Sequence, residues 1–174
     1  MSLLPRRVSA VQIEFLRSTV RRRLVLSLCV ILSIYSYSAR GEVGRAWNVE
    51  AIPWERTAQN GTKYALLEGS RDAKGASFTY AFFIPAGVWD SPHWHSTTAR
   101  VFVAKGALSI GFGDNMDKAQ AATYAAGSIV VVPAGAHHFD GSSVDTIIIG
   151  VATGPWSTTY LDGSLPASAG TPIQ

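Results

Sequence analysis

Six short runs rich in β-branched and aromatic residues most restrict the fold of this 174-residue chain. Each run is closed by Gly, Pro or Asp, at spacings typical of antiparallel sandwiches and barrels. Between the runs only residues 114–122 favour a single helical turn. The pattern predicts an all-β fold, an antiparallel domain of the jelly-roll type. The runs span residues 62–69, 78–87, 99–106, 107–114, 128–135 and 145–154.

Two finer expectations follow from these runs. The apolar stretches Ile129–Val132 and Thr146–Gly150 predict strands that are covered on both faces. The Lys105-Gly106 step between two adjacent runs predicts a tight hairpin turn.

The N-terminal segment 1–38 has the order of a secretory signal peptide. Three arginines, Arg21–Arg23, precede an apolar run that turns small and polar before Ser38. The run is shorter than the roughly 18–20 apolar residues of a membrane span, and an uncleaved anchor is the alternative. We therefore predict a leader over 1–38 and one domain over 39–174, with a loosely held tail from about residue 163. The location expected is periplasmic or extracellular.

Removal of the leader changes the charge and the cysteine content. Beyond residue 38 there are nine basic and eleven acidic residues, a net charge of −2, so the sequence pI of about 9.2 reflects mostly the leader. The remaining basic residues are scattered, which argues against a nucleic-acid-binding face. The only cysteine, Cys29, lies in the leader, so the predicted domain has no disulfide and no thiol nucleophile.

All four histidines lie in two short clusters, PHWHS (His93, His95) and GAHHFD (His137, His138). On a strand, His93 and His95 share one face and Trp94 points to the other. A metal ion needs several ligands at about 2.0–2.1 Å from one point. The second cluster follows an apolar strand and a turn, so it can supply a third imidazole. A surface or core pair of histidines is the alternative for HxH alone.

These residues resemble the two motifs of the cupin family. The first motif is matched by Gly87, His93-x-His95 and Gly106, and the second by Gly127-x5-Pro133-x-Gly135-x2-His138. The resemblance covers roughly residues 77–162 and is to small bacterial cupin-domain proteins of unassigned reaction. It implies a small jelly-roll barrel that is often dimeric. It also implies one divalent ion (Fe, Zn, Mn, Ni or Cu) held by His93, His95 and His138.

The chain departs from the cupin pattern at one metal ligand. The family's glutamate, four or five residues after the second histidine, is replaced here by Ala99 and Arg100. Three neutral imidazoles leave the ion's charge uncompensated and one position open, which weakens binding but can lower the pKa of bound water to about 7. A carboxylate from elsewhere, Asp140 or Asp90, is the alternative fourth ligand.

Four further residues are candidates for the pocket or for contacts to the ligands. Strand alternation turns Arg100 to the outer face, whereas a bulge would turn it inward as an anion-binding group. His137 either faces outward or acts as a proton shuttle. Trp94 and Asp140 are candidates because they lie next to the proposed ligands in the sequence.

We expect an exported cupin that binds a divalent ion and acts on a small organic molecule as a dioxygenase-like oxidoreductase. The alternative is a non-catalytic periplasmic binder of small molecules or metal, which has lost the glutamate. A purely structural ion fits less well, because structural zinc has four protein ligands. The partners expected are a small-molecule ligand and a second copy in a homodimer, with no nucleic acid and no membrane span after cleavage.

Overall fold

The computed structural model describes residues 44–163 and 171–172. The chain divides after Ala46, and the fold below is that of the part from Trp47 onward. The predicted leader and most of the predicted tail lie outside the described residues. Among the residues described, no helix is long and apolar enough to cross a membrane.

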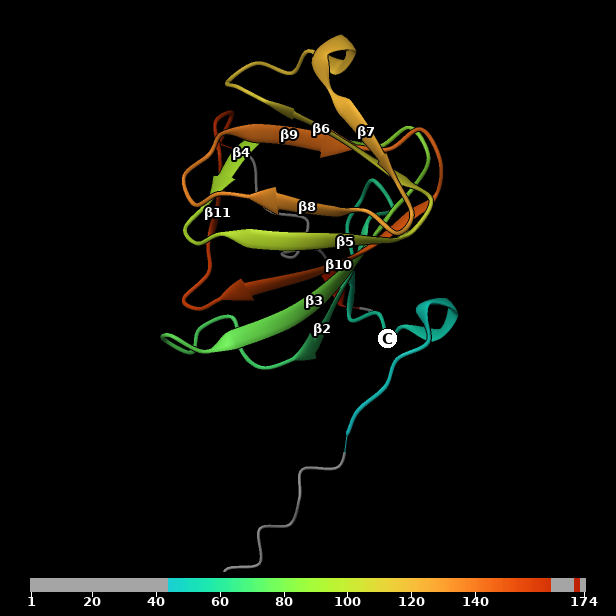
Figure 1. The fold of residues 1–174 in the computed structure, drawn as a ribbon, viewed down its shortest axis with the longest axis vertical. Coiled ribbons are helices and arrows are strands. Elements are labelled where there is room, and N and C mark those ends of the chain that lie inside the picture. The colour runs from blue at the N-terminus through green and yellow to red at the C-terminus, as the bar shows by residue number, and fades with distance from the viewer. Residues whose placement is uncertain (1–43, 164–170, 173–174) are drawn as a thin grey trace, which may run out of the picture. The chain divides into compact units, whose positions relative to one another are not determined.

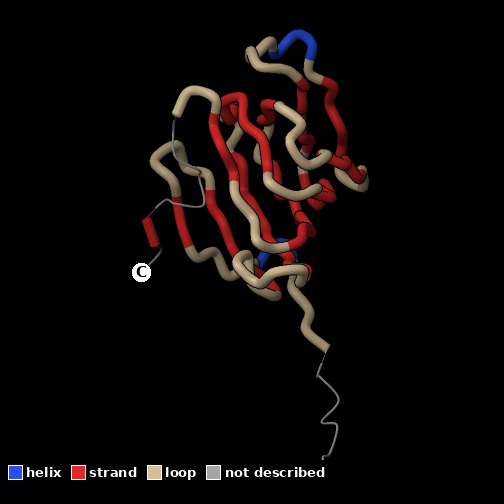
Figure 2. Tube along the Cα trace, turned by 90° about the vertical axis from the view of Figure 1, so that its left-hand side faces the viewer, coloured by secondary structure: helices blue, strands red, loops and turns tan. Residues whose placement is uncertain are grey.

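The fold is all-β, which confirms the sequence prediction (Figure 1). Two antiparallel sheets have the strand orders β12-β1-β2-β3-β10-β5-β8 and β11-β4-β9-β6-β7, an arrangement consistent with a jelly roll. Helix is confined, in the described part of the chain, to two single turns (Figure 2). The elements are η1 (Val49–Ala51), β1 (Arg56–Thr57), β2 (Lys63–Glu68), β3 (Ser77–Ile84), β4 (Trp89–His95), β5 (Ala99–Lys105), β6 (Ala107–Phe112), η2 (Lys118–Gln120), β7 (Ala122–Ala125), β8 (Ile129–Val132), β9 (His138–Gly141), β10 (Thr146–Thr153), β11 (Thr158–Tyr160) and β12 (Thr171–Pro172).

Gly106 forms a corner between the sheets, so the predicted hairpin is wrong. Strand β5 pairs with β10 and β8, whereas β6 pairs with β7 and β9 in the other sheet. Gly106 has a φ of +76°, and a Cβ atom there would clash with the Asp145 carbonyl oxygen. The glycine marks a sharp turn, but its sequence context does not say whether the flanking strands pair or change sheets.

The two apolar strands have different surroundings. Strand β10 lies between β3 and β5 and is largely buried. Strand β8 is at the sheet edge, and Ile129 and Val131 are 69% and 52% exposed. The prediction of cover on both faces is therefore wrong for β8, because an apolar run alone does not reveal what packs on its outer face.

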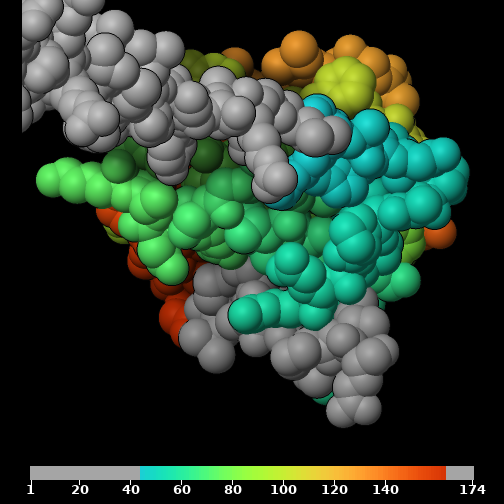
Figure 3. All heavy atoms as spheres, turned by 90° about the horizontal axis from the view of Figure 1, so that it is seen from below, coloured from blue at the N-terminus to red at the C-terminus, as the bar shows by residue number. Residues whose placement is uncertain are grey.

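The main core lies between the two sheets. It joins Val101, Val130 and Ile148 of the larger sheet to Leu108 and Ile110 of the smaller one. A second cluster lies outside the larger sheet, where the segment holding η1 covers β2 and β3 (Figure 3). This cover reaches Ala104 near the end of β5, whereas Phe102, Ile129 and Val131 on the outer side of β5 and β8 are exposed.

Candidate metal centre

Three imidazole rings converge on the inner side of the smaller sheet. Strand β4 carries His93 and His95, and β9 begins at His138, which is the register partner of His93. The ring centroids are 4.2 Å apart for His93 and His138, 4.9 Å for His93 and His95, and 5.0 Å for His95 and His138. One nitrogen from each ring lies within 4.8 Å of the other two. These three residues therefore form a group that could bind one metal ion.

Backbone carbonyls fix which nitrogen faces the shared point in two of the three rings, those of His93 and His138. His93 Nδ1 donates to the Ser91 carbonyl at 2.7 Å, and His138 Nδ1 donates to the Ala136 carbonyl at 2.9 Å. A carbonyl only accepts, so the Nε2 atoms of both neutral rings keep a free lone pair. His95 Nδ1 lies 3.1 Å from the Thr158 hydroxyl. Such contacts orient metal-binding imidazoles in proteins, and the donor set fits a divalent ion.

Burial favours the neutral form of the His95 and His138 imidazoles. Burial, aided by the nearby His93 and His138 rings, lowers the pKa of His95 to about 2. Burial also lowers the pKa of His138, with a further contribution from His93. The neutral ring is the form that binds a metal ion, so protons compete weakly for the site near neutral pH.

Two carboxylates flank His93. Asp140 Oδ2 lies 3.9 Å from His93 Nε2, the nitrogen that faces the centre, while Asp90 Oδ2 lies 3.9 Å from His93 Nδ1. Asp140 and His138 alternate with Phe139 on β9, so both share one face. Burial, and then the charge of Asp140, raises the pKa of Asp90 to about 6. The Tyr160 hydroxyl donates to Asp90 at 2.6 Å.

The three histidines open into a cavity of about 100 Å³ between the sheets. The Trp156 ring lies 4.3 Å from the His95 ring and closes one side. Ala99, at the position of the family's glutamate, is buried and lines the cavity with only a methyl group. Much of the remaining wall is aliphatic: Ile84, Val88, Val101, Leu108, Ile110, Val132 and Ile148.

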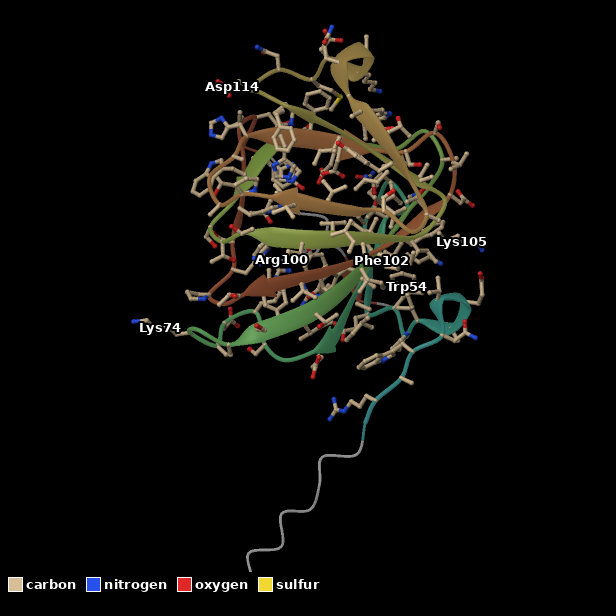
Figure 4. The ribbon with its side chains drawn as sticks, viewed as in Figure 1. Trp54, Lys74, Arg100, Phe102, Lys105 and Asp114 are labelled. Carbon is tan, nitrogen blue, oxygen red and sulfur yellow. The ribbon has the colours of Figure 1, made fainter. Side chains whose placement is uncertain are left out.

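Of the four other candidates from the sequence, only Asp140 lines the cavity. Arg100 is exposed on the outer side of β5 (Figure 4), since Ala99 and Val101 point inward on either side of it. His137 Nδ1 lies 2.6 Å from Asp114 Oδ1 in the loop after β6, away from the cavity lining (Figure 4). Trp94 also lies outside the lining.

Sequence reasoning missed several polar residues of the cavity, among them Arg71, Tyr64 and Tyr160. Arg71 belongs to the loop between β2 and β3, and no motif surrounds it in the sequence. Tyr64 on β2 was indistinguishable from a core aromatic. Only the packing of the two sheets brings these residues to the histidines.

A two-sheet antiparallel fold with three inward histidines from two neighbouring strands defines a cupin-like protein. Residues 43–157, about two thirds of the chain, match the model of the ChrR cupin-like domain family. The chain belongs to this family.

Individual relatives are more distant. Germin-like protein 5-1 of Oryza sativa subsp. japonica is 36% identical over 73 residues, 41% of this chain, and the match spans a third (33%) of that protein's length. A structure from Methylibium petroleiphilum PM1, named as a candidate acetylacetone dioxygenase, is 22% identical with a TM-score of 0.53, covering 74% of this chain and 90% of that one. A variant salicylate 1,2-dioxygenase from Pseudoaminobacter salicylatoxidans, in complex with gentisate, is 13% identical with a TM-score of 0.50, covering 60% of this chain and 30% of that one. The two structures show the similarity of fold.

Proposed function

We propose that this protein binds one divalent ion through His93, His95 and His138 and oxidises a small organic molecule with O2. The observation that carries the proposal is the convergence of the three rings, two of them with Nε2 left free by a backbone hydrogen bond. An ion held in this way supplies a Lewis acid with open positions for small ligands.

Asp140 takes the place of the missing glutamate as the fourth protein ligand. It reaches the centre from β9, whereas Ala99, at the glutamate position, begins β5. Its Oδ2 atom lies 3.9 Å from His93 Nε2, so Asp140 would be near an ion held by that nitrogen. A carboxylate cancels one unit of the ion's charge, which tightens binding relative to three imidazoles alone.

The other residues of the cavity position the substrate and the proton. The aliphatic walls exclude water and give a ligand a dry environment. Asp90, which accepts a hydrogen bond from the Tyr160 hydroxyl, lines the cavity where it can accept and return a proton. The Trp156 ring packs against the His95 ring, at a centroid distance of 4.3 Å.

Oxidation is favoured over binding alone because two proteins of similar fold carry dioxygenase names. The second candidate is a non-catalytic binder of metal or small molecules. It is favoured by Ala99, since a cavity without the usual glutamate has lost a ligand of the family pattern.

Metal analysis and O2 uptake test both candidates. The full chain is expressed, and the purified protein is analysed for bound Fe, Zn, Mn, Ni and Cu. O2 consumption is then measured with the loaded protein and a panel of small thiols, diketones and phenols. We expect one ion per chain and O2 uptake with at least one compound. An ion without uptake would favour the binder, and no ion at all would overturn the metal site and leave only a binder of small molecules.

We also propose that the protein is exported and dimeric. The proposal of export rests on the order of charge and polarity in residues 1–38, and N-terminal sequencing of the mature protein tests it. The proposal of a dimer is supported by exposed apolar side chains on β5 and β8, namely Phe102, Ile129 and Val131. Sedimentation of the parent and of Ile129→Lys tests it, with dissociation expected in the variant.

A further inference from the structure

Arg71 places a positive charge on the wall of the metal cavity. The side chain is partly buried and lines the cavity with Tyr64, and its guanidinium carbon lies 5.5 Å from the centre of the Tyr64 ring. Within the described residues, no carboxylate forms an ion pair with it. A partly buried arginine without an acidic partner retains its fork of donors for an anion from outside.

Tyr64 carries a hydroxyl group whose proton has no acceptor among the described residues. The residue is 5% exposed and lines the cavity, and its oxygen is buried and makes no hydrogen bond of normal geometry there. Burial raises the pKa of Tyr64, although the charge of Arg71 and a weak hydrogen bond from its guanidinium oppose this rise, so the phenol keeps its proton. Arginine can only donate to the phenol oxygen, and a buried hydroxyl whose proton has no acceptor costs free energy, roughly 1–3 kcal/mol. The hydroxyl and the guanidinium together form a pair of donors that a ligand can satisfy.

The charges of the cavity agree with an anionic ligand. Its charged lining residues are Arg71, Asp90 and Asp140, which leave one excess negative charge when both carboxylates are ionised. A divalent ion at the histidines reverses this to one excess positive charge. A monoanion would then neutralise the loaded cavity, whereas a dianion or a cation would leave an uncompensated buried charge.

We propose that the cavity binds a small organic monocarboxylate, with its carboxylate on Arg71 and Tyr64 and its other end directed to the three histidines. This inference rests on the proposed metal site and adds the chemical class of the ligand. Guanidinium binds carboxylate through two parallel hydrogen bonds, and the Tyr64 hydroxyl adds a third. The aliphatic wall between β5, β6 and β10 receives the apolar body of the molecule.

Matched pairs of probes test the charge requirement. Acetoacetate and acetylacetone differ mainly in a carboxylate against a methyl ketone, and benzoate and benzamide differ in a carboxylate against a neutral amide. Binding of all four to the zinc-loaded protein is measured by calorimetry. We expect each carboxylate to bind about tenfold more tightly than its neutral counterpart, the effect of one charge-assisted hydrogen bond.

The same titrations on variants locate the subsite. Arg71→Gln should abolish the preference for the carboxylates while leaving the affinities for acetylacetone and benzamide unchanged. Arg71→Lys should keep part of the preference, and Tyr64→Phe should reduce it. Arg100→Gln is the matched control, because this arginine lies on the outer side of β5 and the preference should be retained.

Three outcomes would count against the subsite. The proposal is overturned if neither carboxylate binds, if the neutral probes bind as well, or if Arg71→Gln keeps the preference. Zinc content is measured in every sample, so a failure of the metal site is seen separately as protein without zinc. A carboxylate preference in the zinc-loaded protein, with no O2 uptake by the protein loaded with Fe, Mn, Ni or Cu, would leave the subsite standing and remove only the oxidation, since zinc itself has no redox chemistry.

Discussion

Residues of similar type lie on the inner and outer sides of the two sheets, where their surroundings differ. The inner side is buried around the cavity, and the outer side of β5 and β8 is largely exposed. In the second histidine cluster, His138 is 2% exposed in the metal centre, while its neighbour His137 pairs with Asp114 outside it. On β5, Ala99 lines the cavity and Arg100 is in solvent. A shift of one residue thus separates a candidate metal ligand from a surface group, because side chains alternate between the two sides of a sheet.

The comparison shows that residue type alone does not assign a role in this fold. The arginine that draws attention in the sequence, Arg100, follows the histidine motif directly but faces outward. The arginine in the cavity, Arg71, comes from the loop between β2 and β3, well before either histidine cluster in the chain. Paired substitutions on the two sides test whether this separation is functional.

The largest difference is expected between the two adjacent histidines. His138→Ala removes one of three imidazoles and should weaken metal binding by about 100-fold or more. This loss should be larger than that caused by removing a residue that only orients a metal ligand. His137→Ala should leave the affinity unchanged. Titration with zinc against a chelator of known affinity measures both, and equal losses in the two variants would refute the geometry of the centre.

A smaller difference is expected for stability on β8. Val130 is 7% exposed and belongs to the core between the sheets, whereas Val131 is 52% exposed. Val130→Ala should lower the free energy of unfolding by about 2 kcal/mol because it leaves a cavity. In the Ile129→Lys background, in which the proposed dimer is dissociated, Val131→Ala should change it by no more than about 0.5 kcal/mol. Urea denaturation gives both values; a similar loss in Val131→Ala would mean that this side of β8 is covered in solution.

The free energy of unfolding of the metal-free protein should depend on pH because His95 is buried. The pKa of His95 falls from 6.5 to about 2 on folding, so below about pH 6.5 the unfolded chain binds more protons and stability decreases as pH falls. The expected slope is about 1.4 kcal/mol per pH unit from His95. The raised pKa of Asp90 opposes this slope between about pH 6 and 3.8, since there the folded state holds the extra proton.

Urea denaturation of the metal-free protein between about pH 7.5 and 5.5 measures this slope. His95→Gln should reduce the slope and leave the part that comes from the lowered pKa of His138. A slope that is the same in the parent and in His95→Gln would show that His95 carries no such shift.

The smallest expected effect concerns the fourth ligand. Asp140→Asn should weaken zinc binding by about tenfold, because it removes a charged ligand and keeps the shape of the side chain. Ala99→Glu places a carboxylate at the family's usual position on the cavity wall and should restore the loss in the double variant. Arg100→Glu, at the adjacent outward-facing position, is the control that should not restore it. Unchanged zinc affinity in Asp140→Asn would exclude Asp140 as a ligand.

The sequence was sufficient for those features that depend on local pattern. Runs of β-branched and aromatic residues closed by Gly and Pro predicted the all-β class, and residues 114–122 were correctly expected to hold a single helical turn, η2. The spacing of His93 and His95 placed both on one side of β4, since alternate positions of a strand share a face. The cupin motifs then singled out His138, which the structure brings within 4.2 Å of His93, centroid to centroid.

Tertiary structure alone decided what depends on contacts between distant segments. The turn at Gly106 could not be recognised as a corner, because pairing is decided by partners far along the chain, such as β8 and β10. The edge position of β8, the carboxylate of Asp140 beside His93 and the arrival of Arg71 and Tyr64 in the cavity have the same origin. Local sequence fixes the direction of a side chain relative to its own strand, whereas the packing of the two sheets determines what that side chain meets.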